Sequence, residues 1–437
     1  MKKILKLFGF RKEVHSLRTE IFSGFSTFIV MAYILSLAPS AFTGIGGTED
    51  PFPVSALFAA VALVSALSSF IMAFYAHRPM AVAPGVGLLF FITGTVCTTM
   101  GYSWHFALTA VFLEGILFTL MTFTGLRTLI VETIPLSLRS GIGVGVGFFL
   151  ASLGLKNAGM LDSGSAILSL ASMVTEPEKL LVAICVLLAG VLIICRIKGA
   201  IFIALVLSTL IGIPLGVTHF DGIVKLPDSP APLFCQMDWG RDVFSVDMIV
   251  CIISILFLDV FDTIGTTIGV LSGTSLTHPN GRVSGMSRIL QVDAISSMLS
   301  GIFGTTTCTS YLESAAGVTE GGRTGVTPFI SGCCFLLALL FSPVFLAIPS
   351  AATGAILLIV SVQMFTAVKH INFTDPVEAI PSVLTILIMA IVGSISDGIV
   401  VGVITYAVLH FVSDMIEERR QRKEGKIFTQ VRKSEEK

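Results

Sequence analysis

Long apolar stretches, separated by short polar or charged segments, recur along the whole of this chain. Most are long enough to cross a hydrocarbon core of about 30 Å as a helix, which takes roughly 20 residues. The pattern predicts about fourteen spans, in two groups of seven. The first group lies at 21–40, 54–75, 80–98, 106–124, 139–155, 179–195 and 199–216. The second group lies at 247–271, 289–303, 308–322, 325–346, 350–367, 378–393 and 396–415.

Composition supports this interpretation, because 54% of the residues are hydrophobic and 13% are charged, whereas soluble domains carry about 25% charged residues. We therefore expect an all-α polytopic membrane protein in a lipid bilayer. A net charge of −1 gives no basis for a nucleic-acid partner. A Gly-rich phosphate loop with its Lys is missing, so an ATP-driven pump is not indicated. The cysteines lack metal-ligand spacing, and we expect neither a metal site nor a cofactor.

The charged segments predict how the chain is oriented in the membrane. An even number of spans puts both termini on one side, and the basic N-terminus and the segment EERRQRKEGK indicate the cytoplasm. We thus expect a multi-pass protein of the cell membrane. The loop cations that then fall on the cytoplasmic side are Arg78, Arg127, Arg139, Arg196, Lys198, Arg282, Arg288, Arg323 and Lys369.

Seven spans in each half is an odd number, so the two halves must be inverted relative to each other. This is the layout of inverted-repeat transporters, whose binding sites lie near the midplane of the bilayer. The predicted organisation is a first repeat at 1–216, an extracellular linker at 217–246, a second repeat at 247–415 and a cytoplasmic tail at 416–437.

Equivalent spans of the two halves contain a break in their helical pattern. The third span reads AVAPGVGLLFF at 81–91, where Pro84 lacks an N–H and disfavours helix at Ala83. The tenth reads TTTCTSYLESAAGV at 305–318, where hydroxyl and β-branched residues favour extended backbone. The alternative is a proline kink in one segment and a Ser/Thr-rich packing face in the other.

Five carboxylates are predicted at membrane depth, where each costs about 2.5 to 3.5 kcal/mol. Asp259 and Asp262 are three residues apart and share a helix face, while Glu313 lies where the tenth span restarts as a helix. Capping of free N–H groups there is an alternative role for Glu313. Glu114 and Asp293, the latter near a helix end, could instead serve packing or hydrogen bonding.

A series of glycines at 141–149, GIGVGVGFF, only superficially resembles a nucleotide-binding loop, because no strand precedes it. We interpret it as a surface for close helix packing.

Taken together, the motifs resemble those of a known transporter family. The matching pieces are TFIVMAYIL, MAVAPGVGLLFF, IPLSLRSGIGVGVGFFLASLGLKNAG, FLDVFDTIGTTIGV, SYLESAAGVTEGGRTGVT and SDGIVVGVITY. In these the chain is similar to the nucleobase-cation symporter-2 (nucleobase/ascorbate transporter) superfamily, and within it to the AzgA-like permeases for hypoxanthine, guanine and adenine. The resemblance implies fourteen helices in a 7+7 inverted repeat, core and gate domains, a homodimer, and short antiparallel strands in spans 3 and 10 at the purine site.

The resemblance also implies roles for individual residues. Asp262 matches the acidic position of the eighth span that binds the base, and Glu313 matches the acidic position of the tenth. A carboxylate can accept two N–H groups of a purine side by side, each bond contributing about 1.5 to 3 kcal/mol. The residues expected to bind substrate are Asp262, Glu313, Leu89, Phe90, Thr27 and Leu312. Those expected to carry the coupling proton are Asp259, Asp262 and Glu313.

Position 89 departs from the family pattern. Where this branch usually has Gly-Leu-Asn-Ala-Phe-Phe, the chain has Leu89 in place of the Asn. If this position lines the site, Leu89→Asn should strengthen hypoxanthine or guanine binding or shift the ranking among bases. The alternative is that Leu89 points into helix packing.

The predicted function is therefore secondary active import of purine nucleobases by proton symport. Transport of another nucleobase-like or small anionic solute on the same fold, as in sulfate-carrier anion exchangers, and sodium-coupled symport stay open. A channel would need a continuous polar pore face. A membrane enzyme would need a nucleophile or a metal cluster, and we expect no enzyme.

Overall fold

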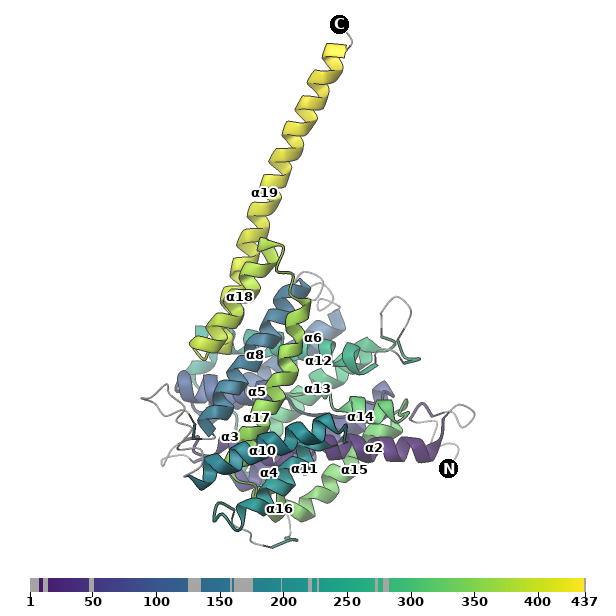
Figure 1. The fold of residues 1–437 in the computed structure, drawn as a ribbon, viewed down its shortest axis with the longest axis vertical. Helices are drawn as coiled ribbons and strands as arrows, with labels where there is room; N and C mark the ends of the chain where they lie inside the picture. Colours follow the sequence, from purple (N-terminus) through teal and green to yellow (C-terminus); the bar gives the residue numbers. More distant parts are fainter. Residues whose placement is uncertain are drawn as a thin grey trace.

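The structure of this chain, a computed structural model, consists almost wholly of helices (Figure 1). Three of the loop cations predicted to be cytoplasmic, Arg127, Lys198 and Arg282, lie outside the described residues. The structure describes residues 8–10, 15–46, 51–124, 135–157, 159–160, 176–197, 199–218, 222–225, 228–271, 274–277 and 283–435.

The first half contains one short strand among its helices. Two of its helical segments, η1 and η2, are π-helices. Its elements are α2 (Leu17–Met31), α3 (Ile34–Phe42), α4 (Val54–Ile71), η1 (Met72–Ala76), β1 (Val82–Pro84), α5 (Val86–Phe90), η2 (Phe91–Thr99), α6 (Trp104–Thr124), α8 (Leu136–Asn157), α10 (Pro177–Ile194) and α11 (Ala200–Gly212).

The second half follows the same plan, with its strand in the equivalent place. Its elements are η3 (Ala231–Leu233), η4 (Arg241–Phe244), α12 (Val246–Leu271), α13 (Met286–Phe303), β2 (Cys308–Ser310), α14 (Ser314–Thr319), α15 (Val326–Ala338), η5 (Leu339–Phe341), α16 (Ser342–Leu346), α17 (Ser350–Phe365), η6 (Thr366–His370), α18 (Pro376–Ile391) and α19 (Ile395–Glu435).

Each predicted span overlaps at least one helix of the structure, and several are divided between consecutive elements, as the first span is between α2 and α3. Nine helical segments of the described chain are long and apolar enough to cross a membrane. Shorter apolar helices lie at Val86–Thr99, Ala200–Gly212 and Pro376–Ile391. The remaining two predicted spans coincide with α13, which is rich in polar residues, and with the segment formed by β2 and α14. The expected polytopic helical fold is confirmed.

The last helix is longer than the predicted span. The fourteenth span was expected to end at residue 415, but the backbone of α19 stays helical to Glu435 and projects beyond the other helices (Figure 1). The sequence of this extension explains why it is helical, because it is rich in Glu, Arg, Lys and Gln and contains no proline. Its charges also exclude it from hydrocarbon.

The helices pack as two groups. In one group, α13 packs on α6, and α15 packs on α2 and α4. In the other, α8 packs on α17 and α18, α10 on α11 and α17, and α18 on α19. Both groups combine helices from the first and the second half of the chain, as core and gate domains of an inverted repeat do.

The glycine series of α8 serves the close packing that the sequence predicts. A Cβ atom built at Gly145 would lie 2.5 Å from the sulfur of Met389 on α18, and one at Gly147 would lie 2.9 Å from the ring of Phe365 on α17. A side chain at these positions would push the helices apart, so the packing interpretation is confirmed.

Candidate functional site

Two short strands meet where the sequence predicts breaks in the third and tenth spans. β1 and β2 pair antiparallel, with Ala83 opposite Thr309. The N–H of Gly85 donates to the carbonyl of Thr307 (3.0 Å), and the N–H of Tyr311 donates to that of Ala81 (3.0 Å), which extends the ladder at both ends. Helices α5 and α14 begin just beyond the strands, so two half-helices start from one small sheet.

Side chains from neighbouring helices satisfy the outer edge of β1. The hydroxyl of Ser69 on α4 donates to the carbonyl of Val82 (3.2 Å) and accepts from its N–H (3.1 Å). The N–H of Ala81 donates to the hydroxyl of Ser314 at the start of α14 (3.0 Å). These bonds are needed because unpaired backbone groups at membrane depth cost several kcal/mol each.

The carboxylate of Asp293 on α13 forms hydrogen bonds with β2. One carboxylate oxygen accepts from the N–H of Ser310 (3.1 Å) and the hydroxyl of Thr263 (2.5 Å), and the other accepts from the hydroxyl of Ser310 (3.0 Å). The hydrogen-bonding role considered for this residue is therefore confirmed. Its expected place near a helix end is wrong, because α13 begins after Gly285, which adopts a left-handed conformation (φ 81°), and Asp293 lies two turns inside the helix.

Glu313 is the residue from which α14 starts, yet its side chain makes no capping hydrogen bond. Instead, its carboxylate accepts from the hydroxyl of Tyr33 (2.8 Å), which lies at the bend between α2 and α3. The tyrosine is buried and the glutamate is half-buried. The contact joins the first span to the tenth and holds the carboxylate beside the strand pair.

Asp262 approaches the same segment from α12. Its carboxylate accepts from the hydroxyl of Thr309 on β2 (3.3 Å), and the side chain is half-buried. The structure thus brings together the two carboxylates that the sequence predicts to bind substrate, each beside the segment formed by β2 and α14. Both are partly accessible although the strands themselves are buried.

Asp259 contacts a different element from Asp262. Its side chain is fully buried and accepts from the hydroxyl of Ser297 on α13 (3.1 Å). Residues three apart on a helix differ in direction by about 60°. That difference is enough for Asp262 to face β2 while Asp259 faces α13.

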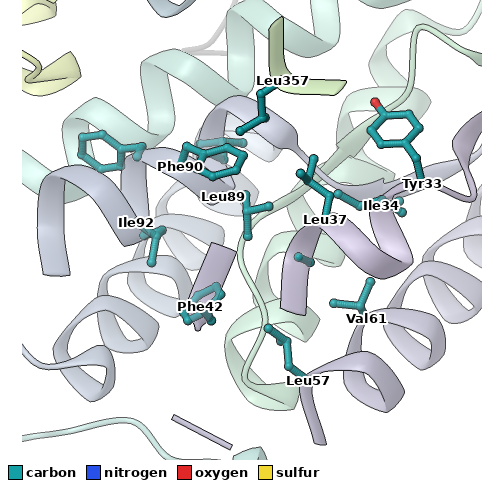
Figure 2. Close-up of a cluster of buried hydrophobic side chains, with 14 of the residues drawn as sticks. Tyr33, Ile34, Leu37, Phe42, Leu57, Val61, Leu89, Phe90, Ile92 and Leu357 are labelled. Atoms are coloured by element: carbon teal, nitrogen blue, oxygen red, sulfur yellow. The ribbon is translucent and has the colours of Figure 1, made fainter. Parts of the chain in front are cut away.

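Leu89 and Phe90 lie on α5 in an apolar cluster. Figure 2 shows Leu89 among the side chains of Ile34, Leu37 and Phe90, all of which belong to the hydrophobic core. Leu89 is only 1% exposed. This environment supports the alternative in which Leu89 serves helix packing.

The two other expected binding residues flank α14. Thr27 is buried, its hydroxyl donates to the carbonyl of Ser23 one turn earlier (2.9 Å), and it lies against Gly317. Leu312 is 44% exposed and lies beside Gly269 of α12.

Sequence reasoning gave no role to three hydroxyl groups at this site. Tyr33 and Thr309 each donate to one of the two carboxylates, and the hydroxyl of Tyr311 donates to the carbonyl of Pro84 on β1. Tyr33 and Tyr311 could have been identified from the sequence as candidate site residues. The chain has only five tyrosines, and these two lie in the TFIVMAYIL and SYLES motifs. Within the described residues, no Lys, Arg or His pairs with either carboxylate.

Spanning helices surround two broken helices that meet at a strand pair with carboxylates beside it. This is the arrangement of inverted-repeat transporters, a class of multi-pass membrane proteins. The transmembrane domain of a cyanobacterial bicarbonate transporter, BicA, has the same fold, with a TM-score of 0.65 and 21% identity over 89% of this chain and 97% of that one.

Sequence comparison gives the family. The family model Xan_ur_permease, described as a permease family, matches residues 18–401. The adenine permease AdeP of Escherichia coli is 33% identical over 92% of this chain and 89% of its own length. The guanine/hypoxanthine permease PbuG of Bacillus subtilis is 34% identical over 90% of both. This chain belongs to the permease family of nucleobase/ascorbate transporters, and the resemblance seen in its motifs is confirmed.

Proposed function

We propose that this protein imports purine nucleobases, such as hypoxanthine, guanine or adenine, across the cell membrane by proton symport. The observation that carries the proposal is the placement of two half-buried carboxylates, Asp262 and Glu313, beside the strand pair. The relatives named for adenine, guanine and hypoxanthine transport support the choice of purines.

The chemistry of a purine fits these carboxylates. A purine carries ring N–H groups and, in adenine and guanine, an exocyclic amino group, all of which are donors. Each carboxylate accepts one hydroxyl, from Tyr33 or Thr309, and a carboxylate has about four lone-pair sites, so acceptor capacity is left for the base. Each charge-assisted bond to the base contributes about 1.5 to 3 kcal/mol.

Proton coupling is proposed for the carboxylates at membrane depth, Asp259 as well as Asp262 and Glu313. A carboxylate at membrane depth is unfavourable unless it is paired or protonated. In a symporter the proton and the base are bound together: a protonated carboxyl group is neutral and still has an acceptor oxygen for an N–H group of the base. A carrier whose acids release or take up a proton on opposite sides of the membrane links the purine to the proton gradient. We further propose a homodimer with both termini in the cytoplasm.

Uptake into proteoliposomes tests this function. Purified protein should accumulate labelled hypoxanthine, guanine or adenine when the outside is made acidic relative to the inside, and the other purines should compete. Uptake should fall when external pH rises or a protonophore is added, because both remove the driving force. Liposomes without protein are the control.

Three outcomes would contradict parts of the proposal. Uptake that resists the protonophore but disappears when sodium is replaced by choline would establish sodium coupling instead. Competition by uracil but not by purines would change the substrate. Uptake of bicarbonate or sulfate without any purine uptake would show that this protein is an anion carrier.

A further inference from the structure

Glu114 is a buried acid for which the proposed substrate site has no use. It lies on α6 and is 0% exposed. Neither of its carboxylate oxygens has a hydrogen-bond partner among the described residues. An ionised carboxylate left in this state would cost far more than a hydrogen-bonded one, so some other group must compensate for it.

Helix α6, which carries Glu114, packs tightly on α13. A Cβ atom at Gly115 would lie 2.5 Å from the backbone nitrogen of Met298, and one at Gly301 would lie 2.7 Å from the Cβ of Phe112. The two helices therefore touch at the backbone on both sides of Glu114. Glu114 lies between the two contact residues of α6, Phe112 and Gly115, in the sequence, and its own side chain is fully buried.

Helix α12, which carries Asp259, packs on both α6 and α13. Phe118 lies one turn after Glu114 on the same face of α6 and packs with Leu256 and Val260, which flank Asp259 in the sequence. The apolar cluster that covers this region consists of Phe118, Met121, Leu256, Val260, Leu290 and Ala294.

Glu114 and Asp259 are both fully buried, and the helices that carry them, α6 and α12, pack on each other. The other ionisable groups near Asp259 are Asp293, Asp262 and the thiol of Cys308. One oxygen of Asp259 has no partner, and in the described part of the chain no Lys, Arg or His donates to either acid.

We propose that Glu114 and Asp259 share a proton and that this carboxyl pair, set apart from the purine contacts, holds the coupling proton of the transport cycle. Two buried carboxylates close to each other disfavour each other's charge, whereas one bound proton turns the first acid into a donor for the second. Glu114 has no other donor, so the proton itself is the compensation that its burial requires. The inference rests on the proposed symport and adds Glu114 to it.

Asp259 connects the pair to the substrate site. The hydroxyl of Ser297 lies within hydrogen-bond distance of both the Asp259 carboxylate (3.1 Å) and the backbone carbonyl of Asp293 (3.0 Å), and can donate to only one of them at a time. Asp293 in turn holds Ser310 of β2. A change in charge on the Glu114–Asp259 pair therefore changes which of the two oxygens the Ser297 hydroxyl donates to. Ser297 lies one turn after Asp293, the residue that holds β2.

Transport by Glu114→Gln separates proton coupling from structure. Gln has the shape of protonated Glu and still donates to Asp259, so the fold and purine exchange in the absence of a gradient should be kept. With one proton per purine, a gradient of one pH unit drives about tenfold accumulation. Wild-type protein and Glu114→Asp, which keeps a titratable group, should show gradient-driven accumulation, whereas Glu114→Gln should show none. Thr119→Val on the same helix, which removes a hydroxyl donated to Met298, is the matched control.

The outcomes distinguish this inference from the proposed function. Wild-type protein that accumulates no purine under a proton gradient contradicts the proposed function before any variant is compared. Gradient-driven accumulation by Glu114→Gln equal to that of wild type overturns the role of Glu114 and leaves the symporter intact.

A second variant and a spectroscopic readout cover the case in which Glu114→Gln does not fold. Asp259→Asn should lose accumulation in the same way. The infrared spectrum of wild-type protein should contain a protonated-carboxyl C=O band whose frequency shifts in Asp259→Asn, because the proton then stays on Glu114 and faces an amide where the wild type has a carboxylate. A spectrum of Asp259→Asn that matches wild type in this region would overturn the shared proton.

Discussion

Replacement of Asp293 tests whether this carboxylate holds the strand at the site. In Asp293→Ala, three donors lose their acceptor: the N–H and the hydroxyl of Ser310 and the hydroxyl of Thr263. In Asp293→Asn, the amide oxygen can still accept two of them. The amide nitrogen can donate to the Ser310 hydroxyl, which then reverses its role.

The expected magnitudes follow from what each donor can do after the change. A hydroxyl can rotate toward a carbonyl one turn earlier in its helix. The loss of the Thr263 hydrogen bond therefore lowers the free energy of unfolding only slightly. The N–H of Ser310 cannot rotate, and a buried donor without a partner costs about 1 to 3 kcal/mol. Removal of a buried charge offsets part of this loss. We expect Asp293→Ala to be less stable than Asp293→Asn by about 1 to 3 kcal/mol.

Thermal unfolding of the purified variants in detergent, together with purine binding at equilibrium, measures both effects. Asp293→Ala should lower the apparent Tm by several degrees and weaken binding, because β2 loses its attachment. Asp293→Asn should change both much less. Asp228→Asn, which makes the same chemical change in an exposed ion pair with Lys225, should leave both unchanged.

Equal stability and equal binding for Asp293→Ala and Asp293→Asn would refute the reasoning. Such a result would mean that the donors of Ser310 find other acceptors and that the strand position does not depend on this carboxylate. A loss of binding in Asp293→Asn as large as in Asp293→Ala, at unchanged Tm, would show instead that the charge itself acts on the substrate.

Three further predictions concern the neighbouring residues. Glu313→Gln and Asp262→Asn should each weaken purine binding by about 1.5 to 3 kcal/mol at normal membrane abundance; reduced abundance with unchanged binding would indicate structural roles. Leu89→Asn should lower the apparent Tm without improving hypoxanthine or guanine binding, because a buried amide without partners costs about 1 to 3 kcal/mol, and tighter binding would show that position 89 faces the base. Gly317→Ala should lower the Tm because its Cβ would lie 2.3 Å from a side-chain oxygen of α2, whereas Gly190→Ala, with open space around it, should be tolerated.

The spans and their breaks were predictable from the sequence because they depend on local properties. Apolar length alone identifies the spanning segments, and Pro84 together with the hydroxyl-rich run before Glu313 indicates where helix gives way to extended backbone. The family motifs placed Asp262 and Glu313 beside that backbone. Hydropathy was less informative at α19, where a charged helix continues beyond the apolar pattern.

The partners of the site residues were not predictable, because they depend on contacts between distant parts of the chain. The hydrogen bond from Tyr33 to Glu313 joins residues 280 positions apart. A tyrosine in the middle of an apolar span is conspicuous, but the sequence does not show which residue its hydroxyl contacts. The burial of Leu89 depends on side chains from α3, which periodicity in the third span cannot reveal. A single sequence shows which residues are unusual for a membrane, but not what each of them faces.

The pairing of β1 with β2 has a consequence for the biogenesis of this protein. The hydroxyl of Tyr311 reaches the carbonyl of Pro84 across 227 positions of sequence. At a synthesis rate of about 5 to 20 residues per second, the second strand emerges about 10 to 45 s after the first. During that interval, the backbone of residues 81–85 has no strand to pair with, and hydrocarbon offers it no substitute. If the first repeat enters the membrane as it is synthesised, residues 81–85 must be shielded from lipid, by the insertion machinery or by neighbouring helices, until β2 arrives.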